Sequence, residues 1–206
     1  MYFVRDGALR SRPCACAARR RSLKRIRESG LGDLYERCTF ETFRTDRPWQ
    51  EYLKRKAEAY VKGQSGWFFV TGRSGSGKTH LTAAIAHALL DAGLETCYFM
   101  WRRDGRRLKA MANDMGYDAE LRRFTDCRVL VIDDLFKGGA VTDADLSLAF
   151  ELLNDRYNRA DALTVISSEL EIKDILLLDE AVCGRITQRA RGFLLQTGDE
   201  DLRLIS

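Results

Sequence analysis

Long apolar runs are missing from this chain of 206 residues, which also contains only two prolines. No run approaches the roughly 20 apolar residues that a membrane-spanning helix needs. Residues 1–4 lead into charged positions rather than an apolar signal region, so secretion is not expected. With 45% hydrophobic and 31% charged residues, the composition is typical of one globular domain with a sizeable core.

A disulfide framework is missing as well. The six cysteines are scattered along the chain, which predicts reduced thiols and a cytoplasmic location. Cys14 and Cys16 are separated by one residue, but a structural zinc site needs four ligands, and neither a second cysteine pair nor a histidine lies nearby. Two interpretations stay open: the remnant of a zinc knuckle, or two ordinary thiols.

Positive charge is concentrated at one end of the chain. Residues 1–27 hold nine lysines or arginines and a single acid, whereas the remainder holds 25 basic and 29 acidic residues. Such an arm often contacts nucleic acid or an acidic partner surface, and a solvated basic tail is the alternative. We therefore divide the chain into a basic arm at 1–38, a possible zinc-binding or helicase-docking remnant, and a domain at 39–206.

An eight-residue motif with the spacing G-x-x-x-x-G-K-T directly follows the apolar run 67–71. In such a loop, backbone N–H groups surround a polyphosphate, and the helix that begins near the lysine adds its positive end. Lys78 is predicted to reach the β- and γ-phosphates of ATP, and the Thr79 hydroxyl to bind Mg²⁺. A plain Gly/Ser-rich turn is the alternative. The residues of this phosphate loop are Gly72, Arg73, Ser74, Gly75, Ser76, Gly77, Lys78 and Thr79.

A second motif favours the nucleotide interpretation. Residues 129–132 form a continuous apolar run that ends in Asp133 and Asp134, as a buried parallel strand does when its end opens onto a ligand crevice. The two motifs together read as Walker A and Walker B. Asp133 is then predicted to hold the Mg²⁺ shell, and Asp134 to orient or deprotonate the attacking water. Alone, the two aspartates are equally consistent with an acidic turn.

Strands alternate with helices along the chain, which predicts an α/β fold with a parallel sheet. Pro48 is placed to start an amphipathic helix that ends before Gly63, with Tyr52 and Tyr60 among its core residues. A basic helical segment is expected around 102–111, and a helix with a capping box at 142–157. Five strands are expected, at 67–71, 96–100, 129–134, 163–167 and 193–196.

Three segments carry a family resemblance: residues 77–81 (GKTHL), 132–135 (IDDL) and 179–186 (DEAVCGRI). They look like the AAA+ domain of DnaC/DnaI-type replicative helicase loaders, including those carried by phages and prophages. Residues 29–31 and 35–43 resemble the segment before that domain in the phage-type members. The IstB-type transposition helper ATPases share most of these motifs. The resemblance implies a minimal P-loop AAA+ core without a separate helical lid.

Carried over by residue, the resemblance implies that Arg185 is an arginine finger that reaches the γ-phosphate bound by a neighbouring subunit. Arg189 and Arg191 lie nearby, so a finger one turn away is an alternative, and a surface cation is the alternative for each of the three. It also implies that His80 of the GKTHL segment belongs to the nucleotide site. Sensor 1 falls at Ser168 or Glu169, and sensor 2 at Arg203. Asp134 departs from the glutamate that most AAA+ ATPases have, which predicts weak turnover.

The expected function is that of an ATP·Mg²⁺-dependent loader that self-associates through Arg185. By resemblance, it binds a hexameric replicative helicase and helps deliver it onto single-stranded DNA. No membrane partner is expected. The basic residues at 102–109 are candidates for DNA contacts. Three alternatives stay open: a transposition helper that prefers duplex DNA, a small-molecule P-loop kinase, and a nucleotide-dependent adaptor with little hydrolysis.

Overall fold

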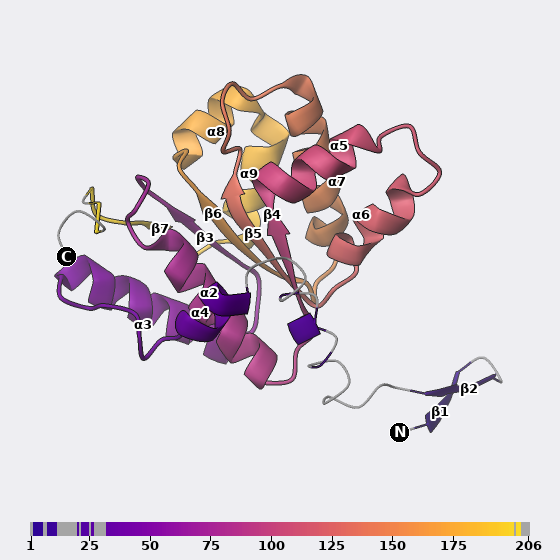
Figure 1. The fold of residues 1–206 in the computed structure, drawn as a ribbon, viewed down its shortest axis with the longest axis horizontal. Helices are drawn as coiled ribbons and strands as arrows, with labels where there is room; N and C mark the ends of the chain where they lie inside the picture. Colours follow the sequence, from indigo (N-terminus) through magenta and orange to yellow (C-terminus); the bar gives the residue numbers. More distant parts are fainter. Residues whose placement is uncertain are drawn as a thin grey trace.

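The computed structural model describes residues 2–5, 8–11, 20, 22–24, 26, 32–199, 201 and 202. Its main sheet is parallel, in the strand order β4-β5-β6-β3-β7 (Figure 1). The predicted α/β fold with a parallel five-stranded sheet is therefore confirmed. The strands are β3 (Trp67–Thr71), β4 (Thr96–Met100), β5 (Val129–Leu135), β6 (Leu163–Ser168) and β7 (Leu194–Gln196).

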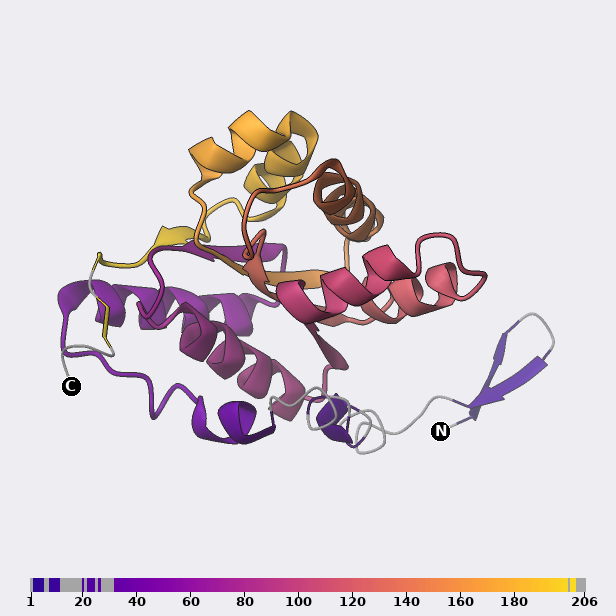
Figure 2. The same cartoon turned by 45° about the horizontal axis from the view of Figure 1, so that its top comes forward.

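Helices cover both faces of this sheet, which lies between them in Figure 2. One face carries α2 (Gly32–Arg37), α3 (Pro48–Gly63) and α4 (Lys78–Asp91). The other carries the π-helix η1 (Trp101–Gly105), α5 (Arg106–Ala110), α6 (Tyr117–Thr125), α7 (Asp143–Tyr157), α8 (Ile172–Leu178) and α9 (Glu180–Arg189). A hairpin of β1 (Tyr2–Arg5) and β2 (Ala8–Ser11) stands apart from the sheet in Figure 1.

Strands β3, β4, β5 and β6 are largely apolar because both of their faces are buried, whereas two of the three residues of the edge strand β7 are exposed. Along β3, Trp67 and Phe69 pack into the core that contains residues of α7 and α9, whereas Phe68 and Val70 pack into the core under α3 and α4. All four side chains are fully buried. Because its side chains alternate between the two cores, β3 is held between the helix layers. The segment that follows Thr71 is therefore anchored at its start.

Helix α3 begins at Pro48, as predicted, and includes Gly63 as its last residue, although the predicted helix ended before that glycine. Its buried stripe contains Leu53, Ala57 and Tyr60. Tyr52 lies beside that stripe and is 46% exposed, so its assignment to the core was wrong. A helix that packs through one stripe leaves the next position around its circumference in solvent.

Part of the predicted basic arm packs against the sheet. The Ile26 and Cys38 side chains are buried in the core under α3 and α4. The Ser22 hydroxyl accepts a hydrogen bond from the backbone N–H of Thr96 on the edge strand β4, at 3.1 Å. The boundary between residues 38 and 39 stays a prediction.

Four cysteines lie in the described part of the chain, and all are free and buried: Cys38, Cys97, Cys127 and Cys183. Cys14 and Cys16 lie outside it. Among the described residues, no helix combines the length and the apolar character that a membrane crossing requires.

Arg156 on α7 is a fully buried arginine that the sequence analysis did not identify. Its guanidinium donates to the backbone oxygens of Phe124, Thr125, Cys127 and Leu163 at 2.7–3.0 Å. Its Nε donates to the Thr164 hydroxyl at 2.9 Å. One side chain thus joins the end of α6 to the starts of β5 and β6, and burial lowers its pKa from the ordinary value.

Replacing Arg156 by methionine is expected to lower the free energy of unfolding by about 3–5 kcal/mol, because several buried carbonyl oxygens lose their donor at once. For a domain of this size the melting temperature should fall by roughly 10 °C. Chemical denaturation followed by circular dichroism measures the change. Arg122→Met on the exposed side of α6 is the matched control. Equal stability of the two variants would contradict the role assigned to Arg156.

Candidate nucleotide site

The phosphate loop connects the end of β3 to the start of α4, as the sequence predicted. Strand β3 ends at Thr71, and α4 begins at Lys78 with Gly77 as its N-cap. The N-cap makes no side-chain hydrogen bond to the first turn of α4. Backbone N–H groups at the start of this helix are therefore oriented as donors for an anion, and the helix dipole adds to their attraction.

Gly72 is the position in this loop that most requires glycine. Its φ is +150°, and a Cβ atom there would lie 1.8 Å from the Thr197 Oγ1 atom. Thr197 follows β7, and its backbone N–H donates to the Thr71 carbonyl at 2.8 Å. The close approach of the chain after β7 therefore excludes any larger residue at the start of the loop.

Lys78 lies folded into the loop, with only 4% of the residue exposed. Its Nζ atom donates to the carbonyl oxygens of Gly72 at 2.6 Å and Arg73 at 2.7 Å. Burial lowers the pKa of Lys78, against the opposing effect of the Asp134 and Glu169 carboxylates. A cation is thus held where the loop would surround a polyphosphate.

Thr79 and Asp133 meet across the end of the sheet. The Thr79 hydroxyl donates to the Oδ1 atom of Asp133 at 3.1 Å, and the Ser167 hydroxyl donates to the same atom at 2.7 Å. Burial raises the pKa of Asp133, while these two hydrogen bonds work to lower it. A hydroxyl and a carboxylate are hard oxygen ligands, so the pair fits Mg²⁺, which takes few protein ligands when it also binds phosphates.

Asp134 is bound from two sides. Its backbone N–H donates to the Ser167 hydroxyl at 2.9 Å, and its Oδ2 atom accepts from Lys137 Nζ at 2.9 Å. The same Lys137 Nζ lies 2.9 Å from the Oε1 atom of Glu169. Hydrogen bonds to both carboxylates raise the pKa of Lys137, although burial works to lower it. Lys137 and Ser167 were not predicted from the sequence, where their signal was their closeness along the chain to predicted site residues.

Of the two candidates for sensor 1, the structure brings Glu169 to the loop. The Glu169 carboxylate is hydrogen-bonded to the Ser74 side chain. Ser168 is fully buried, and its hydroxyl donates to the Leu135 carbonyl at 2.9 Å. Ser168 contacts the loop through its backbone oxygen, which accepts from the N–H of Gly72 at 3.3 Å.

His80 holds the segment before α3 against α4. Its Nε2 atom lies 3.2 Å from the Thr42 hydroxyl and 3.3 Å from the Thr39 carbonyl, and its ring meets Phe43 edge-on at 5.4 Å. Burial lowers the pKa of His80. The contacts of His80 are therefore with the segment 39–43, which packs beside the start of α4.

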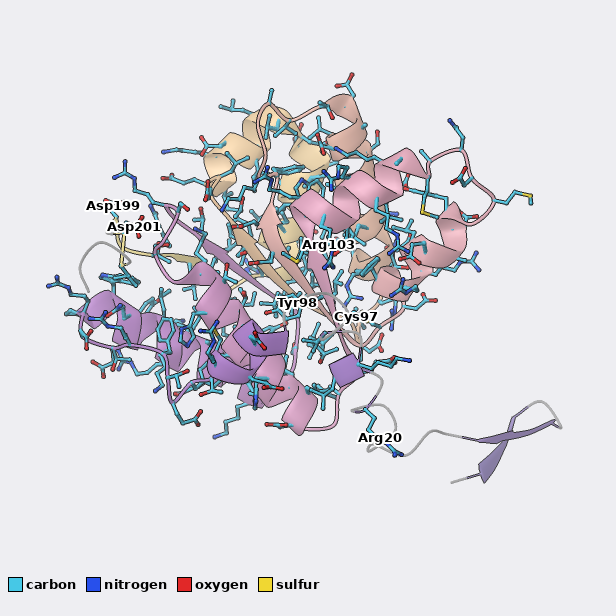
Figure 3. All side chains as sticks on the ribbon, in the orientation of Figure 1. Arg20, Cys97, Tyr98, Arg103, Asp199 and Asp201 are labelled. Carbon is cyan, nitrogen blue, oxygen red and sulfur yellow. The ribbon has the colours of Figure 1, made fainter. Side chains whose placement is uncertain are left out.

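The C-terminal segment also reaches the loop. The Leu202 N–H donates to the Gly75 carbonyl at 3.1 Å. Asp199 and Asp201, labelled in Figure 3, lie beyond the end of β7. Arg203, the candidate for sensor 2, lies outside the described residues.

Arg185 is not brought to the phosphate loop of its own chain. It lies on α9, where its guanidinium donates to the Asn154 side-chain oxygen at 2.8 Å. The same group lies 4.3 Å from the centre of the Phe150 ring and 5.7 Å from that of Tyr157. These three partners belong to α7. The contacts of Arg185 are therefore with α7 and not with the phosphate loop.

Residues 19–204 match the family described as IstB-like ATP binding protein. The chain belongs to the IstB-like ATP-binding proteins. Its Walker residues thus lie in a family that binds ATP, and its fold is that of a P-loop AAA+ ATPase. The resemblance to DnaC/DnaI-type loaders is also confirmed by the following relatives.

Three relatives of this IstB-like protein extend the comparison. "Phage-like element PBSX protein XkdC" of Bacillus subtilis (strain 168) is 31% identical over 214 residues, covering 94% of this chain and 77% of that one. "Uncharacterized protein YqaM" of the same strain is 33% identical over 201 residues, covering 90% and 63%. "Replicative helicase loader DnaC" of Escherichia coli (strain K12) is 30% identical over 138 residues, covering 63% and 56%. The chain spans less than two thirds of YqaM and DnaC.

Solved structures share the fold of this IstB-like protein. The crystal structure of DnaI superposes with a TM-score of 0.63 at 22% identity, covering 81% of this chain and 92% of that one. AMPPCP-bound DnaA from Aquifex aeolicus gives 0.66 at 16% identity, covering 81% and 52%. At such identities the likeness shows the AAA+ core alone.

Proposed function

We propose that this chain is an ATP-hydrolysing helicase loader, which binds a hexameric replicative helicase and helps deliver it onto single-stranded DNA. One observation carries the ATPase part: Lys78, Thr79, Asp133 and Asp134 come together at the end of the sheet. Thr79 is hydrogen-bonded to Asp133, and both aspartates act electrostatically on Lys78, whose Nζ atom is bound by carbonyl oxygens of the loop. The similarity to replicative helicase loader DnaC supports the choice of partner.

In the proposed reaction the loop and Lys78 bind the triphosphate, and Thr79 and Asp133 would hold Mg²⁺. The metal supplies charge neutralisation of the β- and γ-phosphates when it is bound. Asp134 accepts a hydrogen bond from the attacking water and orients it. Because an aspartate is one methylene shorter than a glutamate, we expect slow turnover, with ATP binding as the conformational switch.

Mixing with a helicase tests the loader function. This protein and the replicative helicase of its own host are combined with and without ATP·Mg²⁺, and size-exclusion chromatography with light scattering measures the mass. We expect a complex of defined stoichiometry. If no complex forms under either condition, the loader proposal is wrong.

The family match gives specific support to a second candidate, an IstB-like transposition helper. Such a protein would pair with a transposase and prefer duplex DNA, whereas a loader would prefer a single strand. Binding of labelled single-stranded and duplex DNA of equal length separates the two. Phosphate release with and without DNA distinguishes either one from a non-hydrolysing adaptor.

A basic cavity of about 230 Å³ reduces the number of candidate residues for DNA contacts. Its lining includes Arg102 and Arg106, and among the described residues no ion pair to a carboxylate is found for either. By contrast, Arg103, labelled in Figure 3, pairs with Asp104. Arg107 and Lys109 also pair with carboxylates. Arg102 and Arg106 are therefore the cations best placed to bind a nucleic-acid backbone.

Reversing both charges, as Arg102→Glu with Arg106→Glu, is expected to weaken single-stranded DNA binding by about tenfold. The slope of log affinity against log salt should fall by about 1.4, since each lost phosphate contact contributes about 0.7. Fluorescence anisotropy at several salt concentrations measures both. The control is Arg55→Glu with Lys62→Glu, on exposed positions of α3. An unchanged slope would show that DNA binds elsewhere.

A further inference from the structure

Lys137 stands between two carboxylates at the nucleotide site. Its Nζ atom lies 2.9 Å from Asp134 Oδ2 and 2.9 Å from Glu169 Oε1. The side chains of Lys137, Asp134 and Glu169 are 30%, 24% and 35% exposed, so they are shielded from solvent in part. At these distances one ammonium neutralises much of the field of both carboxylates.

The backbone after β5 turns sharply to bring Lys137 there. Asp134 and Phe136 both have left-handed backbone conformations, with φ of +58° and +64°. The pairing of β5 with β6 is irregular between Ile132 and Leu135. The Lys137 N–H then donates to the Asp134 carbonyl at 2.9 Å. This turn places the Lys137 side chain beside the Asp134 carboxylate. A left-handed bulky residue such as Phe136 is a strained feature of the kind that gathers at functional sites.

Both carboxylates interact with residues of the phosphate loop. Glu169 is hydrogen-bonded to Ser74 within the loop, and Asp134 and Glu169 both act electrostatically on Lys78. A polyphosphate that enters the loop would therefore meet two negative side chains. Without a second cation beside Lys78, this repulsion would oppose nucleotide binding.

We propose that Lys137 is a positioning residue of the nucleotide site, which holds Asp134 beside Glu169 and offsets their repulsion of the bound phosphates. The inference rests on the proposed ATP binding at this loop. Glu169 can then contact the loop although it carries the same sign of charge as the ligand. Asp134 keeps its second oxygen, Oδ1, for the water that it orients.

The test measures binding of a non-hydrolysable ATP analogue with Mg²⁺ by isothermal titration calorimetry. Lys137→Met is expected to raise the dissociation constant about tenfold, because the two carboxylates then lose one of the two lysines, Lys137 and Lys78, that act on them electrostatically. Lys137→Arg, which keeps the charge, should bind within about twofold of the wild type. Lys173→Met is the matched control, since Lys173 pairs with Glu171 on the exposed part of α8 and lies outside the site.

A second substitution separates charge from structure. In the double variant Lys137→Met with Glu169→Gln, the dissociation constant should return to within about threefold of the wild type, because the excess negative charge is gone. A lysine that only supported the fold would not be rescued by that change. Unchanged affinity in Lys137→Met, or no rescue in the double variant, would overturn the inference. Wild-type protein that binds no nucleotide would instead overturn the proposed function and this inference with it.

Discussion

Replacing Arg185 by alanine is expected to lower the rate of ATP hydrolysis per subunit by about 10³-fold, with nucleotide affinity changed by less than about threefold. An arginine finger acts on the charge that develops on the transferred phosphoryl group, so its loss affects turnover rather than ground-state binding. In this chain the Arg185 guanidinium lies on Phe150 and binds Asn154, away from its own phosphate loop. We therefore expect Arg185 to act on the γ-phosphate that a neighbouring subunit binds.

Mixed assemblies test action between subunits directly. Arg185→Ala subunits keep the nucleotide site, and Lys78→Ala subunits keep the finger. In an equal mixture about one interface in four joins an intact site to an intact finger, so roughly a quarter of the wild-type rate should return. Release of phosphate is measured for each variant and for the mixture. If the rate of Arg185→Ala stays at the wild-type value, while Arg191→Ala loses activity, the finger is Arg191, beyond the end of α9.

Replacing Lys78 by alanine is expected to reduce kcat/KM for ATP by about 10²–10³-fold and to weaken nucleotide binding. The lysine supplies a buried cation to the β- and γ-phosphates, and such preorganised charge contributes several kcal/mol at a site shielded from water. Its Nζ atom also binds the carbonyl oxygens of Gly72 and Arg73, so the loop itself loses two hydrogen bonds.

Calorimetric titration and phosphate release together measure the two effects of Lys78→Ala. Lys62→Ala, on an exposed position near the end of α3, is the matched control and should behave as the wild type. Thermal melts of both variants separate a local change from global unfolding. Hydrolysis by Lys78→Ala within about threefold of the wild type would place the chemistry outside this loop.

Local patterns were enough to predict the strands and the phosphate loop. Strands β3 to β6 are largely apolar runs because both faces of the sheet are covered there, and the spacing of Gly72, Gly77 and Lys78 lies within one loop. Asp133 was predicted because it ends such a run. These signals involve neighbours in the sequence, so they can be read without a structure.

Contacts between distant segments were not predictable in this way. Ser167 lies 34 residues from Asp133 and reaches it only because β5 pairs with β6. Lys137 contacts Asp134 because Asp134 and Phe136 adopt left-handed backbone conformations. Neither position is a glycine, so the sequence did not predict this turn. Arg156 reads as a solvent-facing charge on a helix, yet it is satisfied by carbonyl oxygens from three other segments. The helices α2, α6, α8 and α9 and the hairpin were missed.

The position of β3 in the sheet sets the order in which the protein can acquire its site. β3 carries the phosphate loop, but its two partners are β6, which begins at Leu163, and β7, which begins at Leu194. Closing such long loops costs entropy before the contacts repay it, so folding is expected to be slow. During synthesis the loop cannot be held in its final shape until the chain beyond Thr197 has left the ribosome. We therefore expect a nascent chain to form helices before it can bind nucleotide, and a chain truncated before Thr197 to form helices without binding nucleotide.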